Sequence, residues 1–253
     1  MTIWSRRSTR EAAMDKAVTD TGVKLALEHV TSGYGAVAII RDLTLDIRRG
    51  EIFALMGKNG MGKTTLLKTI LGLIAMKDGT IRFDGAEITG AEPKALVEAG
   101  VAYAPQDQPL FQDLSIRDNL RLALPADRHL AAGLEHVCQH FPFLKDRLAQ
   151  KAGTLSGGEQ KMLIIARALM TGPNLLLIDE ISEGLQPTVV ARIAAALKAE
   201  RSENGTTILL VEQNLDFALG IADRWALLKL GSIDDAGTVG AGTHQQVLSH
   251  LQI

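Results

Sequence analysis

The sequence predicts an α/β fold with a mainly parallel sheet in its core, a small N-terminal antiparallel β subdomain and a helical subdomain. Short apolar runs alternate with helical stretches, as they do in βαβ units. The clearest buried strands are Glu51 to Met56, Val101 to Ala104, Leu175 to Asp179 and Thr206 to Val211, and each ends at a polar or glycine-rich turn. Because ligands of open α/β sheets bind at the carboxyl ends of the strands, we expect the chemistry at these turns.

The N-terminal subdomain is predicted from two apolar segments that precede the first buried strand. Leu25 to Val30 and Ile39 to Ile47 form antiparallel strands in this interpretation, joined around the turn from Ser32 to Gly35. In the second segment apolar residues alternate with polar neighbours, which is typical of a strand with one buried face. These two strands predict a small sheet of their own.

Residues 1–24 form an extension in this interpretation, and the domain spans residues 25–253. The extension is polar and charged and shows no clear periodicity, so we expect it to be mobile. One alternative is contact with a membrane surface or a partner through Trp4 and the neighbouring arginines. Another is a true start of the chain at Met14.

The helical subdomain is predicted between about residues 107 and 170. From Ser115 to Ala152 apolar residues recur at mixed helical spacings, which indicates helices without strands inserted in the core. His136 and His140 are four residues apart in this stretch and could share one helix face as metal ligands. With no third ligand motif nearby, we assign no metal to them.

Composition limits the classes of function. The 253 residues are 46% hydrophobic, which is enough for one large core or two modest ones. The 27 basic and 29 acidic residues give a net charge of -2, so nothing favours a nucleic-acid partner. Cys138 is the single cysteine, which excludes an internal disulfide. No apolar run approaches the roughly 18 to 20 residues that span a bilayer, so we expect a chain that does not itself cross a membrane.

A glycine-rich loop follows the first buried strand and precedes a helical stretch, which is the context of a phosphate-binding P-loop. Its glycines let backbone amides close around phosphates, Lys63 reaches the β and γ phosphates, and the Thr64 hydroxyl ligates Mg²⁺. A purely structural turn is the alternative. The residues predicted to bind the nucleotide here are Gly57, Asn59, Gly60, Gly62, Lys63, Thr64 and Thr65.

Two carboxylates end another buried strand. Asp179 and Glu180 complete the run that starts at Leu175, at the edge of the sheet where Mg²⁺ is expected. We predict that Asp179 holds the water shell of the metal and that Glu180 orients or deprotonates the attacking water. Without the P-loop upstream, the same two acids would indicate a solvated helix start.

A pair of glycines begins a helix at Leu155-Ser156-Gly157-Gly158-Glu159-Gln160. Ser156 suits an N-cap, so an ordinary capped helix is one interpretation. Paired glycines also leave amides free to bind an anion, and Gly158 lowers helix stability with no evident structural return. Because one P-loop already holds the phosphates, a second anion site indicates a nucleotide presented by another subunit.

These three elements, in this order and spacing, resemble the ATP-binding cassette (ABC) family from about Leu25 to the C-terminus. The resemblance implies a P-loop NTPase core and an Mg²⁺-dependent ATPase. It also implies a head-to-tail dimer, of identical or different subunits, that sandwiches ATP between the P-loop of one subunit and Ser156 and Gly158 of the other. Hydrolysis then requires both subunits.

The resemblance also implies roles for residues outside the three motifs. Tyr34 matches the aromatic residue that stacks on adenine, with a core tyrosine as the alternative. Gln106 matches the glutamine that touches Mg²⁺ and reports to the transmembrane partner, so the implied metal set is Thr64, Gln106 and Asp179. Gln213 stands where a switch histidine is usual, and it can orient by hydrogen bonds without taking a charge.

Two departures from the family pattern narrow the resemblance. The loop from Ser182 to Pro187 and the sequence Glu212-Gln213-Asn214 are similar to the ATPase subunits of branched-chain amino acid and amide (urea-type) importers. This subfamily implies a partner ATPase, separate transmembrane permease subunits and, indirectly, a solute-binding protein. It also implies a peripheral protein at the cytoplasmic face of the inner membrane.

Two other function classes remain as alternatives. A soluble cassette ATPase of translation or DNA repair usually fuses two cassettes or inserts long coiled coils, and neither pattern is present. A catalytically weak subunit that binds ATP while its partner hydrolyses it is suggested by Gln213 and the Ser182 to Pro187 loop, whereas Glu180 argues against it.

Overall fold

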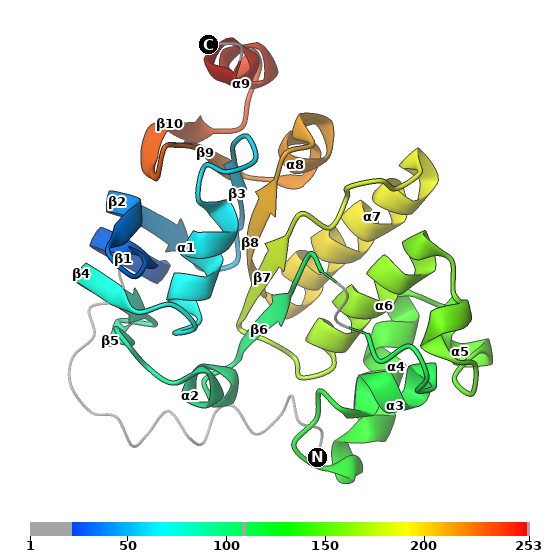
Figure 1. Cartoon of the computed structure of the whole chain (residues 1–253). Helices are drawn as coiled ribbons and strands as arrows, with labels where there is room; N and C mark the ends of the chain where they lie inside the picture. The colour runs from blue at the N-terminus through cyan, green and yellow to red at the C-terminus, as the bar shows by residue number, and fades with distance from the viewer. Residues whose placement is uncertain (1–21, 108–109, 252–253) are drawn as a thin grey trace.

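Two β-sheets of different geometry organise the chain in the computed structural model, which describes residues 22–107 and 110–251 (Figure 1). The first sheet is four-stranded and antiparallel, so the predicted N-terminal β subdomain is present and is enlarged by two further strands. Its strands, in sheet order, are β2 (Val37–Arg48), β1 (Val23–Tyr34), β4 (Met76–Phe83) and β5 (Ala86–Glu87).

The second sheet is six-stranded and mainly parallel, as predicted, and only its edge pair β9–β10 is antiparallel. Four of its strands begin and end within one residue of the predicted buried runs. In sheet order the strands are β10 (Ser232–Thr238), β9 (Arg224–Lys229), β3 (Ile52–Met56), β8 (Thr207–Glu212), β7 (Leu175–Asp179) and β6 (Val101–Ala104).

The parallel sheet is buried on both faces because each strand alternates its apolar side chains between two cores. On β3, Phe53 and Leu55 face the core shared with the antiparallel sheet, while Ile52 and Met56 face the core under the helices. Helix α1 (Lys63–Ile70) lies between the two sheets (Figure 1). The β3–α1 connection is therefore held by both cores.

The helical insert lies between β6 and β7 and covers the face of the parallel sheet opposite α1 (Figure 1). Two helices of the core, α7 (Pro187–Asn204) and α8 (Leu215–Ile221), share this face, while α2 (Pro93–Glu98) and α9 (Thr243–Leu251) lie elsewhere in the chain. No helix of the described residues combines the length and the apolar character needed to cross a membrane. The helices of the insert are α3 (Ile116–Arg121), α4 (Leu130–His140), α5 (Phe143–Asp146) and α6 (Gly157–Leu169), with short 3₁₀ turns at Asp127–His129 and Ala152–Thr154.

Two boundaries differ from the sequence-based expectation. β1 begins at Val23, and Lys24 forms an ion pair with Asp84 at 2.8 Å. Val23 and Lys24 therefore belong to the sheet rather than to the extension. Residues 1–21 of the predicted extension lie outside the described residues, while the carbonyl oxygen of Gly22 accepts a hydrogen bond from the backbone amide of Arg49 at 2.8 Å. The predicted turn from Ser32 to Gly35 starts too early: β1 continues to Tyr34, and Ser32 is buried with its hydroxyl 2.6 Å from the Thr69 hydroxyl. The chain turns after Tyr34 instead.

Candidate active site

The glycine-rich loop connects β3 to α1 at the carboxyl edge of the parallel sheet. Gly62, the N-cap of α1, has a left-handed backbone with φ of 104°, a conformation that favours glycine. A Cβ atom at Gly57 would lie 2.6 Å from the carbonyl oxygen of Leu228 on β9. The backbone path therefore requires glycine at both ends of the loop, and the amides at the start of α1 are directed at one anion site.

Lys63 is the first residue of α1 and is only 4% exposed. Its Nζ donates hydrogen bonds to the carbonyl oxygens of Gly57 at 2.8 Å and Lys58 at 2.9 Å. The third contact of Nζ is an ion pair with Glu180 Oε1 at 2.9 Å. The ammonium group is thus fully paired inside the loop, and a bound phosphate would replace some of these partners.

Glu180 follows β7 directly and is the centre of a cluster of predicted site residues. Its backbone has a φ of 44°, which is rare for a residue with a side chain, and it is only 4% exposed. Besides Lys63, the side-chain amide of Gln106 donates to Oε2 at 3.0 Å, and that of Gln213 donates to both oxygens at 3.2 Å. Gln213 also donates to the side chain of Asn59 in the P-loop. A strained backbone that its surroundings hold in place is typical of functional sites.

Asp179 is fully buried at the end of β7. Its Oδ2 accepts a hydrogen bond from the Tyr103 hydroxyl at 3.2 Å, while its Oδ1 has no hydrogen-bond partner among the described residues. Burial raises the pKa of Asp179, the nearby Thr64 hydroxyl opposes this, and the nearby Glu180 raises the pKa further. Mg²⁺ would satisfy the bare oxygen and favour the ionised carboxyl, so Asp179 and Thr64 fit as metal ligands.

Gln106 lies just after β6 and joins the cluster to the helical subdomain. Its side-chain amide also donates to Glu183 at 2.9 Å. The backbone carbonyl oxygen of Gln106 accepts a hydrogen bond at 2.8 Å from Nζ of Lys161, a residue of α6. Glu180, Gln106 and Lys161 of α6 are thus linked by consecutive contacts.

Sequence reasoning missed four residues that build this site: Tyr103, Lys161, Glu183 and Glu212. Glu212 is 1% exposed and accepts hydrogen bonds from the backbone amide of Ser182 at 3.0 Å and from its hydroxyl at 2.8 Å. Burial raises the pKa of the Glu212 carboxyl, although these hydrogen bonds lower it. Glu212 thereby holds the loop that follows Glu180, beside a pocket of about 330 Å³. The available signal was its place at the end of β8.

The helix start at Ser156 stands apart from the Glu180 cluster. Ser156 is the predicted N-cap and forms a capping box with Glu159, whose carboxylate accepts from the Ser156 amide at 2.9 Å. Among the described residues, its hydroxyl hydrogen-bonds only to Glu159. A Cβ atom at Gly158 would lie 2.9 Å from Val189 on α7, so this glycine has the packing reason that the sequence did not reveal. Gly157 faces open space instead.

Tyr34 is 54% exposed at the end of β1, which excludes the core tyrosine considered as the alternative. The hairpin that carries it lies beside the P-loop, because Ile39 and Ile40 of β2 are the nearest neighbours of a Cβ atom built on Gly62. Its ring is therefore available to stack on a base, although it does not belong to the Glu180 cluster.

Comparison with known proteins decides the family. The family model described as "ABC transporter" matches residues 40–183, more than half of the chain and from the P-loop through Glu180. The chain belongs to the ABC transporter family. This ABC protein is 38% identical to the high-affinity branched-chain amino acid transport ATP-binding protein BraG of Pseudomonas aeruginosa, over 83% of this chain and 90% of that protein. It is 37% identical to the probable branched-chain amino acid transport ATP-binding protein LivF of Archaeoglobus fulgidus, over 83% and 89% of the two chains.

Solved structures agree with the fold of the ABC protein. A nucleotide-free ATP-binding cassette from an ABC transporter superimposes with a TM-score of 0.82 over 90% of this chain and 95% of that one, at 24% identity. A dimeric cassette in a post-hydrolysis state, bound to ADP and Pi, gives a TM-score of 0.76 over 86% of this chain and 99% of that one, at 22% identity. At these identities the likeness shows the fold alone.

Family membership confirms the predicted class of activity. The ABC protein is an ATP-binding and ATP-hydrolysing subunit of a transporter, with Mg²⁺ as its cofactor and with transmembrane subunits as partners. When bound, Mg²⁺ neutralises charge on the β and γ phosphates. The P-loop with Lys63 and the bare oxygen of Asp179 lie at the carboxyl edge of the same sheet, an arrangement that fits an anion beside a cation.

Proposed function

We propose that this ABC ATPase powers the uptake of branched-chain amino acids or a related amide through separate permease subunits. BraG and LivF, whose names describe branched-chain amino acid transport, support this solute class. The loop from Ser182 to Pro187 and Gln213, which resemble the same subfamily, support it independently. The subunit works at the cytoplasmic face of the inner membrane as a peripheral protein, and a solute-binding protein delivers the solute to the permease.

In this proposal Glu180 orients or deprotonates the water that attacks the γ phosphate of ATP. The observation that carries the assignment is the convergence of Lys63, Gln106 and Gln213 on its buried carboxylate. Phosphates that enter the P-loop take Lys63 from Glu180, which leaves the carboxylate free to accept a proton from water. Gln213 holds the water or a phosphate oxygen through its neutral amide.

The remaining predicted residues bind ATP and its metal. Thr64, Asp179 and Gln106 are the proposed metal set, directly or through water, and the bare oxygen of Asp179 supports it. Tyr34 stacks on the adenine, which its exposure supports. The phosphates bind to the P-loop through backbone amides and side chains of Gly57, Asn59, Gly60, Gly62, Lys63, Thr64 and Thr65.

Ser156 and Gly158 are proposed to bind the γ phosphate of the ATP held by the partner subunit. Ser156→Arg should leave the isolated subunit folded and able to bind ATP but should block ATP-driven dimerisation, because the long cationic side chain fills the space of that phosphate. The matched control is Ser115→Arg, which removes the N-cap of α3 instead. Light scattering with and without Mg-ATP measures dimerisation, and a Ser156→Arg protein that still dimerises would reduce the motif to a capped helix.

The transport function is tested on the assembled complex. The chain is combined with permease and solute-binding proteins encoded beside its gene, and ATP turnover is measured with leucine, isoleucine, valine or small amides. Turnover that rises with one of these solutes supports the proposal, whereas turnover that none of them changes contradicts it. The alternative of a catalytically weak subunit is tested by a complex that carries Glu180→Gln in this subunit only. If this subunit is catalytically weak, the substitution leaves the ATP turnover of the complex unchanged.

A further inference from the structure

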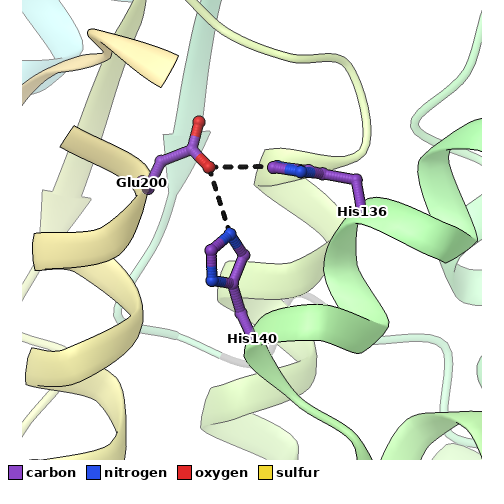
Figure 2. Close-up of side chains that lie close together, drawn as sticks. All are labelled: His136, His140 and Glu200. Atoms are coloured by element: carbon purple, nitrogen blue, oxygen red, sulfur yellow. Dashed lines mark ion pairs between the residues drawn. The ribbon is translucent and has the colours of Figure 1, made fainter. Parts of the chain in front are cut away.

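A second cluster of potential ligands lies outside the nucleotide site, where α4 of the helical subdomain packs against α7 of the core. His136 and His140 are one helical turn apart on α4, and Glu200 comes from α7. Figure 2 shows both imidazole rings directed at the same carboxylate oxygen. Nε2 of His136 lies 3.0 Å from Glu200 Oε2, and Nε2 of His140 lies 3.4 Å from it.

The carboxylate at the centre of this cluster is buried. Glu200 has no exposed surface. Its other neighbours are neutral: the Thr206 hydroxyl donates to Oε1 at 2.7 Å, and the Asn204 amide donates to Oε2 at 3.0 Å. A buried anion requires a compensating positive charge, which must come from protonated imidazoles or from a cation held by them.

The spacing of the donor atoms suits a cation. Tetrahedral Zn²⁺ with bonds of about 2.0 to 2.1 Å keeps its ligand atoms about 3.3 to 3.4 Å apart. The contacts of 3.0 and 3.4 Å to Glu200 Oε2 approach this spacing, and all three donor atoms lie within 4.8 Å of one another. The buried Nε2 of His140 has no hydrogen-bond partner among the described residues. The two rings are perpendicular, at 89°, so they converge on the carboxylate rather than stack.

We propose that His136, His140 and Glu200 bind a divalent transition-metal ion of the Zn²⁺ class and thereby tie the helical subdomain to the core. Two imidazole nitrogens and one carboxylate oxygen are donors that such ions prefer, and water completes the shell. The hydrogen bonds from Thr206 and Asn204 fix the carboxylate, as outer-shell contacts do in metal sites. This site is independent of the transport function proposed above.

The test is a titration of the purified full-length chain with Co²⁺, in excess Mg²⁺ and without nucleotide. We expect one Co²⁺ per chain with the visible absorption of tetrahedral nitrogen and oxygen ligation, and displacement of this Co²⁺ by Zn²⁺. Loss of outer-shell contacts costs metal sites about 10- to 100-fold in affinity. Loss of a ligand in His136→Gln or His140→Gln should therefore exceed about 100-fold. His244→Gln, which changes an exposed histidine, should bind Co²⁺ like the unaltered chain.

A second readout is the melting temperature, which does not depend on activity. At Zn²⁺ concentrations about 100 times the Kd, the midpoint should rise by roughly 5 °C in the unaltered chain and in His244→Gln but not in His136→Gln. Substitution of the fully buried Glu200 would test folding as well as metal binding, so the two histidine variants carry the test. Two results would overturn the proposal in favour of a metal-free imidazolium–carboxylate cluster. One is Co²⁺ binding that is unchanged in both histidine variants, and the other is a melting temperature of the unaltered chain that Zn²⁺ does not change at any pH.

Discussion

The buried ion pair between Lys63 and Glu180 predicts that Glu180→Gln tightens ATP binding and abolishes turnover. Both side chains are almost completely buried, with 3% and 5% of their surfaces exposed, and their charged atoms lie 2.9 Å apart. The Glu180 carboxylate is thus paired with the Lys63 ammonium group that incoming phosphates require. Glutamine retains an oxygen that can accept a hydrogen bond from Lys63, but it removes the charge that competes with the phosphates and repels them.

The size of both effects follows from this contact. Lys63 stays charged in Glu180→Gln, so its hydrogen bond to the glutamine oxygen remains one that involves a charged group, in the range of about 1.5–3 kcal/mol, and loss of the carboxylate charge moves it from the upper to the lower part of that range. The weaker competitor therefore leaves about 1 to 1.5 kcal/mol more for ATP, which corresponds to roughly 5- to 10-fold tighter binding. Loss of a positioned general base lowers turnover by about 100- to 10,000-fold. Lys63→Ala should act in the opposite direction on binding, because it removes the phosphate ligand itself.

The assay combines calorimetry with a non-hydrolysable ATP analogue and single-turnover hydrolysis by the assembled complex. The matched control is Glu183→Gln, because Glu183 also contacts Gln106 but is exposed and is not among the partners of Lys63, which are Gly57, Lys58 and Glu180. This control should change both quantities little. Normal hydrolysis by Glu180→Gln would refute the role of its carboxylate, and unchanged affinity would refute the competition for Lys63.

Three further outcomes are expected. Gln213→Ala should slow hydrolysis by about 10- to 100-fold with little change in affinity, and Gln213→His should stay active; a full-rate but slightly less stable Gln213→Ala complex would make Gln213 a structural residue. Lys161→Met should weaken ATP-driven dimerisation, measured by light scattering, without changing ATP affinity of the isolated chain, because it cuts the link from α6 to the carbonyl oxygen of Gln106. The hydrogen bond from the Ser156 amide lowers the pKa of Glu159 below 4.5 in the folded chain, so the ionised Glu159 stabilises the fold above pH 4.5. This contribution to the free energy of unfolding is lost as the pH falls through the folded-state pKa, and urea denaturation at several pH values should show no such loss in Glu159→Gln.

The sequence located four buried strands of the parallel sheet and the half-exposed pair β1 and β2, and it missed β4, β5, β9 and β10. β7 reads as an unbroken apolar run, so its limits can be predicted from composition alone. β10 alternates exposed and partly buried residues and contains Asp234 and Asp235, which weakens the strand signal. The turn in the β1–β2 hairpin was misplaced because serine is common in turns. The hydroxyl of Ser32 instead forms a buried hydrogen bond with the hydroxyl of Thr69.

Site residues were predictable where a motif fixes them along the chain and unpredictable where only tertiary contact brings them together. Glu180 and Lys63 belong to two motifs at the same sheet edge, so their proximity follows from topology. Tyr103 lies within a buried strand and reads as a core residue until its hydroxyl is seen on Asp179. Glu200 follows His140 by 60 residues on another helix, so the sequence offered no third ligand for the histidine pair.

The contacts around Glu180 form a continuous connection from the P-loop to the helix that begins at Ser156. Lys63 contacts Glu180, Glu180 contacts Gln106, and the carbonyl oxygen of Gln106 contacts Lys161 on α6. A phosphate that takes Lys63 releases one side of Glu180, while Gln106 keeps its second acceptor in Glu183. The loop that carries Gln106 can then shift while the side-chain amide of Gln106 keeps a hydrogen-bond acceptor. Because Lys161 is bonded to this loop, we expect α6 to move with it. In the proposed dimer, nucleotide bound in the P-loop would therefore influence the position of the glycines that we propose bind the ATP of the partner subunit, through contacts that are individually small and testable by substitution.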